Sequence, residues 1–182
     1  MNPPPIGEAL GVGWNTFKAN MVPIGLGILC AMVVGLIPVV GGGLAFAGFM
    51  KVSLKALRGQ EPEAADGFAG FEATVDHIVM GLWQLVGILA CCVGVYVSQA
   101  VFFPGTLLIL DRQMSWSAAK DECMARMAPQ WAAWTLFLVV VSLVASSGLI
   151  LCGVGVLFTA PIGLIALAYA YEQTMGTGAA TA

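Results

Sequence analysis

Residues 78–110 read IVMGLWQLVGILACCVGVYVSQAVFFPGTLLIL and contain no charged residue. A helix that crosses a bilayer needs about 20 apolar residues, with a range of about 17–25. The stretch is therefore too long for one crossing and close to the length of two short ones. Because glycine interrupts helices, we place the turn of a predicted helical hairpin at Cys92-Val93-Gly94.

Two further uncharged stretches, 19–50 and 127–171, are also too long for one crossing. Each also carries helix-weakening residues near its middle, and we take these residues as the predicted turns. They are Pro38 and Gly41-Gly42-Gly43 in the first stretch, and Gly148, Gly153 and Gly155 in the second.

The composition of the whole chain agrees with a membrane protein. Of its 182 residues, 59% are hydrophobic and 9% are charged, and the mean hydropathy is +0.93. A soluble domain is typically about one quarter charged, so this chain cannot cover a water-facing surface. We therefore expect an all-α polytopic membrane helix bundle, folded as a single integral membrane domain over residues 1–182.

The positions of the charges predict the number of crossings. All seven basic residues flank the three stretches, and none lies in a predicted turn. Three hairpins place every charge on one side, and the positive-inside rule makes that side cytoplasmic. Three single crossings would instead separate Lys51, Lys55 and Arg58 from Arg112, Lys120 and Arg126. We therefore predict six crossings, with both termini in the cytoplasm, at residues 20–37, 40–58, 77–93, 95–112, 130–150 and 154–172.

The chain divides into three similar units, 1–60, 61–113 and 114–182. The second helix of each predicted hairpin opens with Val-Gly and its polar end finishes in Gln, which indicates an internal repeat. These segments are VGGGLAFAGFMKVSLKALRGQ (40–60), VGVYVSQAVFFPGTLLILDRQ (93–113) and VGVLFTAPIGLIALAYAYEQ (154–173).

A short amphipathic helix is predicted before each hairpin, at the membrane interface. In 115–128 we expect Ser115 to cap the helix and Glu122 to pair with Arg126 one turn later. The apolar stripes are Ile6, Leu10, Trp14, Phe17 and Met21 in the first unit, Phe68, Phe71 and Val75 in the second, and Trp116, Ala119, Cys123 and Met127 in the third.

The order of several features resembles a known family. They are Trp14 and Asn20, the Pro-Gly turn at 38–43, DGFAGF at 66–71, Phe-Pro-Gly at 103–105, and Pro161 followed by Tyr169 and Tyr171. Together they resemble six-helix bacterial inner-membrane proteins of unknown function that are related to the membrane domain of glycerophosphoryl diester phosphodiesterases. The resemblance implies a six-helix membrane module in the bacterial cytoplasmic (inner) membrane. No stretch here could form the soluble phosphodiesterase barrel, so no catalytic residue is carried over.

Ionisable residues at the membrane border are the first candidates for a ligand site. Lys51 either extends its stem to the headgroups or contacts an anion within the bundle. Asp76 and His77 begin the third predicted crossing. The helix macrodipole alone explains a carboxylate there, although Asp76 with Glu72 resembles half of a cation site.

The remaining candidates lie farther along the chain. Asp111 and Arg112 are expected to form an interfacial ion pair or to contact lipid headgroups. Gln84 and Gln99 lie within predicted crossings and are candidates for a polar seam.

Several functional classes are not supported by the sequence. We find no nucleophile, phosphate-loop or metalloprotease motif, and the five cysteines lack C-x-x-C spacing. We therefore expect no enzyme activity, no cofactor and no metal. With a net charge of −3 and no large basic cluster, nucleic acid is not an expected partner. Whether Cys92 and Cys152 pair is left open.

The expected function is that of a non-catalytic scaffold, assembly or accessory subunit of the bacterial inner membrane. Its expected partners are membrane lipids and either a second copy or another membrane protein. One alternative is a small transporter or channel for a lipid or small solute, because repeated hairpins and interrupted helices occur in transporters. A weaker alternative is a lipid-modifying enzyme that uses the charges at the inner interface.

Overall fold

The computed structural model describes residues 2–37, 41–87, 91–148 and 155–176, with the side chains of Cys91 and Cys92 left out. Every regular element in these ranges is a helix, as predicted. The elements are α1 (Ile6–Ala19), α2 (Met21–Gly35), α3 (Gly41–Leu57), η1 (Ala64–Ala73), α4 (Thr74–Leu85), α5 (Cys91–Arg112), α6 (Trp116–Arg126), η3 (Ala128–Gln130), α7 (Trp131–Ser146) and α8 (Val156–Thr174).

Three helical stretches in the described residues are long and apolar enough to cross a membrane. They are Val93–Arg112, Trp116–Ser146, which includes α6 and η3 as well as α7, and Val156–Thr174. α1 and α2 together would make a fourth, but they are bent by 100° with respect to each other. The chain is therefore a helical protein with membrane-spanning potential, and the bend at Asn20 separates α1 from the hairpin that follows it.

The helices pack as three hairpins: α2 with α3, α4 with α5, and α7 with α8. The predicted turn at Cys92–Gly94 is misplaced, because these residues lie in the first turn of α5. Of the first predicted turn, Gly41–Gly43 lie in the first turn of α3. Glycine is tolerated in a first turn, where Gly41 donates its N–H to the carbonyl of Ile37 at 3.0 Å. Pro38, Gly153 and Cys152 lie outside the described residues.

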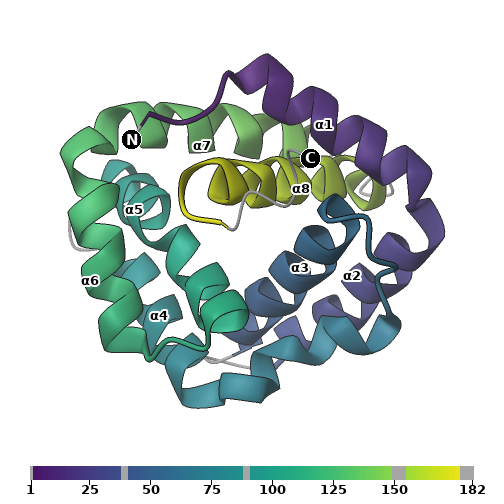
Figure 1. Ribbon diagram of the computed structural model, residues 1–182, viewed down its shortest axis with the longest axis horizontal. Helices are drawn as coiled ribbons and strands as arrows, with labels where there is room; N and C mark the ends of the chain where they lie inside the picture. Colours follow the sequence, from purple (N-terminus) through teal and green to yellow (C-terminus); the bar gives the residue numbers. More distant parts are fainter. Residues whose placement is uncertain (1, 38–40, 88–90, 149–154, 177–182) are drawn as a thin grey trace.

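The second helices of the hairpins form the centre of the molecule. Figure 1 shows α3, α5 and α8 surrounded by the remaining helices. Burial agrees with this view, because α8 is buried along most of its length from Pro161 to Thr174. The main apolar core also draws on α3, α5 and α8, with Met50, Leu107 and Ala166 each fully buried.

Each amphipathic helix packs mainly on the hairpin of the preceding unit. η1 contacts α2 and α3, α6 contacts α5, and α1 contacts α8 of the last unit. At the last contact, a Cβ added to Gly13 would lie 2.5 Å from the carbonyl oxygen of Ile162. The packing is therefore cyclic, and α1 closes it by joining the start of the chain to its end.

The predicted apolar stripes fare differently in the three units. In α6 the stripe is confirmed, with Ala119, Cys123 and Met127 fully buried. In α1 Phe17 is buried, but Trp14 and Met21 are about half exposed, and the buried face is made by Ala9, Gly13 and Phe17.

In η1 the predicted stripe is not the face that packs on other helices, because Phe68, Phe71 and Val75 are all exposed. The packed face consists of Asp66, Gly67, Ala69 and Gly70 instead. These small residues let the backbone of η1 approach α2 and α3 closely.

Two of the hairpins are closed by the same hydroxyl contact near their turns. Ser98 on α5 donates to the carbonyl of Gln84 at 2.5 Å and accepts from the N–H of Gly87 at 3.2 Å. In the third unit Thr159 on α8 donates to the carbonyl of Ala145 at 2.7 Å and accepts from the N–H of Gly148 at 3.2 Å. The sequence separations are the same in both pairs, which gives the repeat of units two and three a structural counterpart.

Candidate functional site: a charged layer and an axial cavity

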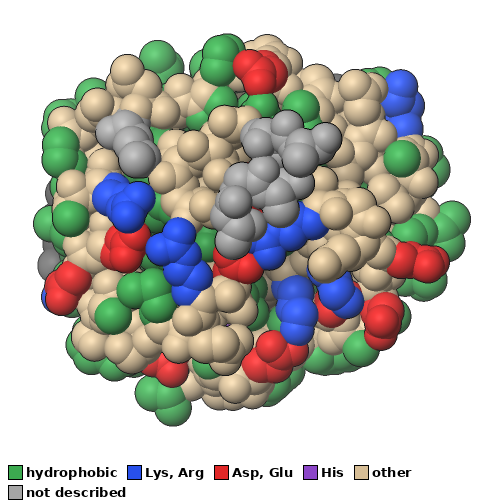
Figure 2. All heavy atoms as spheres, viewed as in Figure 1, with side chains coloured by type: hydrophobic (Ala, Val, Ile, Leu, Met, Phe, Trp, Pro, Cys, Tyr) green, Lys and Arg blue, Asp and Glu red, His purple; other side chains and the backbone are tan. Residues whose placement is uncertain are grey.

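The charged side chains gather at the ends of the hairpins that lie away from the turns. Figure 2 shows Lys, Arg, Asp and Glu side chains distributed together over this face of the molecule. The charges thus form one layer in which basic and acidic groups are interleaved. Most of the described ionic contacts lie within this layer, and they connect different helices.

Arg58, just after α3, is at the centre of the layer. Its Nη1 and Nη2 atoms bind Oδ1 and Oδ2 of Asp111 on α5 at 2.6 and 3.0 Å. The same guanidinium also donates to Oε1 of Glu172 on α8. The hydrogen bond to Asp111 is the main cause that raises the pKa of Arg58 above its usual value. We call Arg58, Asp111 and Glu172 the axial triad.

The three residues of the axial triad occupy the same position in their units. Each lies seventeen residues after the glycine of a Val-Gly pair, Gly41, Gly94 or Gly155. Equivalent positions of the three repeated helices thus meet at one point, as they would on a rotation axis that relates the units. We infer from this meeting point a pseudo-threefold axis at the ends of α3, α5 and α8.

The axial triad is largely buried, with the Arg58 side chain 17% exposed. The side chain of Glu172 is fully buried and that of Asp111 is 10% exposed. Tyr171 donates its hydroxyl to Asp111 at 3.1 Å, while the second carboxylate oxygen of Glu172 has no partner among the described residues. Sequence reasoning missed Arg58 and Glu172, although their spacing from the Val-Gly pairs is a signal that could have found them.

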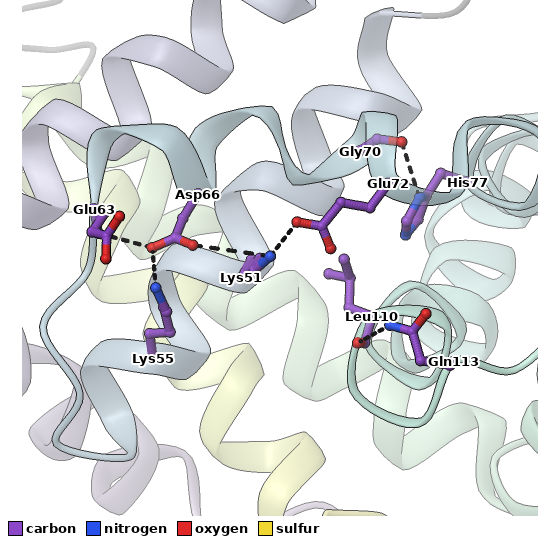
Figure 3. Close-up of polar contacts among 9 residues, drawn as sticks. All are labelled: Lys51, Lys55, Glu63, Asp66, Gly70, Glu72, His77, Leu110 and Gln113. Carbon is purple, nitrogen blue, oxygen red and sulfur yellow. Dashed lines mark hydrogen bonds and ion pairs between the residues drawn. The ribbon is translucent and has the colours of Figure 1, made fainter.

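Lys51 and Lys55 fix η1 to α3, as Figure 3 shows. Lys55 donates to Asp66 at 2.8 Å, and Lys51 donates to Glu72 and lies 4.0 Å from Asp66. Asp66 also accepts the N–H of Glu63 at 2.8 Å, which caps the start of η1. Lys51 thus contacts two carboxylates of the protein itself.

Asp76 and His77 have separate partners. Asp76 accepts the backbone N–H of Trp116 at 2.8 Å and so caps α6. Ser115, the predicted cap, makes no capping hydrogen bond. His77 is 1% exposed, and its Nδ1 lies 3.2 Å from the carbonyl oxygen of Gly70 in η1 (Figure 3). Among the described residues no group of three or more His, Cys, Asp and Glu is placed to hold a metal ion.

Asp111 and Arg112 are neighbours in sequence but do not pair with each other. Asp111 belongs to the axial triad, while Arg112 lies 3.5 Å from Glu122 of α6 and donates to the carbonyl of Met175. The predicted pair of Glu122 and Arg126 is confirmed at 2.9 Å. Arg112 therefore joins α5, α6 and the end of α8.

A small hollow of about 160 Å³ lies beside the axial triad. It is lined by Lys51, Lys55 and Arg58, together with Leu54, Gln60, Leu110 and Asp111. Each of the three basic residues already binds a carboxylate. The hollow is thus part of the ionic layer that holds the helices together.

A much larger cavity of about 610 Å³ lies between the three hairpins, towards their turns. Gln84 and Gln99 both line it. The Gln84 amide donates to the hydroxyl of Thr106 at 3.1 Å, whereas the described residues offer the Gln99 amide no hydrogen-bond partner. Apolar side chains make most of the remaining wall. We call this feature the axial cavity.

Comparison of the chain with protein-family models, curated proteins and solved structures finds no match. The resemblance to membrane proteins related to glycerophosphoryl diester phosphodiesterases therefore remains a prediction. What the chain does has to be argued from the charged layer and the axial cavity.

Proposed function

We propose that the protein crosses the bacterial cytoplasmic membrane six times, as three hairpins, with the charged layer and both termini in the cytoplasm. The pairing of α2 with α3, α4 with α5 and α7 with α8 supports this arrangement. So does the placement of every basic residue outside the turns, because basic residues are retained on the cytoplasmic side. α1, η1 and α6 then lie at the cytoplasmic interface.

Cysteine labelling tests this orientation. In a variant without native cysteines, Gln60→Cys and Gln113→Cys should react with a membrane-impermeant maleimide only from the cytoplasmic side. Leu36→Cys, which is 80% exposed at the end of α2 near the first turn, should react only from the opposite side. Gln60→Cys and Gln113→Cys on opposite sides would contradict the three-hairpin arrangement.

Within this arrangement the proposed function is that of a non-catalytic membrane module, a scaffold or accessory subunit. The observation that carries it is how the charged side chains are used. The axial triad joins α3, α5 and α8, Lys51 and Lys55 hold η1, and Asp76 caps α6. These groups bind one another or the backbone of a neighbouring helix, and they hold the helices together as a ring. Such a ring suits a platform for other molecules.

Cross-linking of the tagged protein in its native membrane tests the scaffold. A scaffold should give one discrete species of higher mass, from a second copy or from a partner at fixed stoichiometry. The Arg58→Met variant serves as a control, because loosening the ring should remove that species while the protein remains in the membrane. Recovery of only the monomer mass would contradict this function.

The second candidate function is a carrier for a lipid or a small apolar solute. The axial cavity favours this function, because the cavity lies between the hairpins and extends from their turns to the buried core. Flux of a fluorescent lipid across reconstituted vesicles measures it directly. We expect flux with the native chain and a lower rate with Gln99→Ala; no flux in either would end this candidate.

A further inference from the structure

The axial cavity lies on the same pseudo-threefold axis as the axial triad. Its wall includes residues from equivalent positions of all three units, which a cavity to one side of the axis would not do. One set is Met32, Gln84 and Ala145, which lie three residues before Gly35, Gly87 and Gly148 at the ends of the first helices. The other set is Phe46, Gln99 and Ala160, which lie five residues after the glycine of each Val-Gly pair. The cavity therefore lies between the three units, and its deepest wall belongs to the buried core.

The wall becomes more buried with depth. Met32, Leu85 and Leu157 line the cavity and are between 39% and 46% exposed, so they form its mouth. Phe103, Leu138 and Leu167 line it as well, but they are only 2–6% exposed. The three residues at the mouth lie within the proposed crossings, so we infer that the mouth is at the depth of the bilayer. Because most of the wall is apolar, hydrocarbon is the expected main content.

The dimensions of the cavity distinguish between a lipid chain and a helix. A helix 10–12 Å in diameter fills roughly 400–600 Å³ per turn, so about 610 Å³ would hold little more than one turn. Along α8 the wall runs from Val156 to Leu167, which is about 17 Å at 1.5 Å per residue. One leaflet of the hydrocarbon core is about 15 Å thick. The cavity thus has the length of one leaflet and the volume of a small ligand.

Two polar groups face the cavity in its half nearer the turns. They are the amide of Gln99 and the hydroxyl of Ser142, and the described residues offer neither a hydrogen-bond partner. Both residues are only partly buried, so their polar atoms are accessible to a ligand in the cavity. A ligand with an apolar chain and a carbonyl or hydroxyl near one end would pack its chain against the apolar wall and form hydrogen bonds with these two groups.

We propose that the axial cavity binds one acyl chain of a phospholipid from the leaflet that faces the hairpin turns. The ester carbonyl of the lipid accepts a hydrogen bond from the Gln99 amide, and the chain extends along α8 to Phe103 and Leu167. This inference rests on the six-crossing orientation proposed above. It names the lipid as the ligand for which the cavity is built.

A photoactivatable phospholipid tests the proposal. The protein is reconstituted in vesicles of phosphatidylethanolamine and phosphatidylglycerol that include a phosphatidylethanolamine with a diazirine near the end of one acyl chain. After illumination, adducts should map to the peptides that contain Phe103, Leu138 and Leu167. Lipid in the surrounding bilayer cannot reach these side chains because they are buried.

Variants that fill the cavity make the test specific. Ala160→Phe copies Phe46 at the equivalent position, and Ser142→Phe fills the cavity from α7. Either change should remove most of the adduct at Phe103 and Leu167. Ala133→Phe on the exposed face of α7 is the matched control and should leave the adduct unchanged. The thermal unfolding midpoint of each variant shows whether it has folded.

Several outcomes would overturn the proposal. Adducts confined to exposed residues such as Leu143, or an equal yield in Ala160→Phe and the native chain, would show that no acyl chain enters. Labelling by a diazirine fatty acid but not by the phospholipid would assign the cavity to free fatty acids. Intermolecular cross-links at Met32 and Leu157 would assign it to a second copy. Failure of the protein to float with the vesicles would instead contradict the proposed membrane function itself.

Discussion

Arg58 binds both carboxylate oxygens of Asp111, at 2.6 and 3.0 Å, and so joins the end of α3 to the end of α5. The contact is parallel and two-pronged, which is the strongest geometry for an arginine and a carboxylate. With Glu172 on the same guanidinium, three helices from three units are held at a single point. This point lies at the ends of the hairpins away from their turns, while the apolar cavity lies towards the turns.

The axial triad should contribute strongly to stability as a unit. Arg58→Met leaves the buried carboxylates of Asp111 and Glu172 without a counter-charge, and the loss of one partner from a buried ion pair costs about 3–5 kcal/mol. We expect a clear fall in the midpoint of thermal unfolding in detergent. The exposed-side control Arg126→Met should cost only about 0.5 kcal/mol or less.

The same triad offers a stricter test of this explanation. Replacement of all three residues, as Arg58→Met, Asp111→Leu and Glu172→Met, removes the uncompensated charges along with the pairs. Such replacements of buried ion pairs are often neutral or stabilising, so the triple variant should be more stable than Arg58→Met alone. A triple variant that is less stable than the single one would contradict the account.

The turn of the second hairpin depends on the absence of a side chain at Gly87. A Cβ at this position would lie 1.8 Å from the carbonyl oxygen of Gly94, which is backbone and cannot give way. Gly87→Ala should therefore force α4 and α5 apart and lower the unfolding midpoint sharply. Gly25→Ala is the control, since its Cβ meets nothing within 4 Å, and it should gain up to about 1 kcal/mol in helix propensity.

The hairpins could be predicted from the sequence because charges and apolar runs alternate so regularly. The predicted crossings 20–37 and 130–150 correspond to α2 and α7 within a few residues at each end. The positions of the turns were predicted less accurately, because glycine occurs both where a helix ends and where one begins. Gly41 and Gly94 are inside helices that begin at or before them.

The ring of amphipathic helices could be predicted only where large apolar side chains make the contact. In α6 Cys123 and Met127 show the packed face directly in the hydrophobic pattern. In η1 the packed face is made by Gly67 and Gly70, and a Cβ at Gly67 would lie 2.4 Å from the carbonyl oxygen of Gly27. Hydrophobic periodicity does not register glycine, so the pattern indicates the exposed Phe68 and Phe71 and not the face that packs.

The candidate site was predicted in part for a similar reason. Lys51, Asp76 and Asp111 were singled out because a charge at the membrane border is costly. Their partners lie 21, 40 and 53 residues away in sequence. The sequence around a residue cannot reveal partners at such distances. For the axial triad, however, the equivalent positions of the three residues in their units indicate that they belong together.

The hydroxyl of Thr159 should stabilise the third hairpin beyond its own helix. Thr159→Val keeps the shape of the side chain but leaves the N–H of Gly148 without its partner at 3.2 Å. An unsatisfied donor of this kind costs about 1–3 kcal/mol, and the midpoint of thermal unfolding should fall accordingly. Thr135→Val is the control, since Thr135 is exposed and bonds only to Trp131 of its own helix. Equal effects of the two changes would contradict a role for the contact across the hairpin.

Closure of the ring by α1 should depend on Gly13. Its missing side chain lets α1 approach the backbone of Ile162, and Glu8 on the same helix accepts a hydrogen bond from Tyr169. Gly13→Leu should push α1 away from α8 without disturbing the hairpins, so trypsin should cut after Lys18, beside the bend, faster than in the native chain. Gly11→Leu adds the same side chain two residues earlier, where a Cβ meets nothing within 4 Å, and should leave the cleavage rate unchanged. If both variants were cut at the native rate, α1 would not need this close contact to stay on α8, and the ring would have to be closed by the remaining contacts alone.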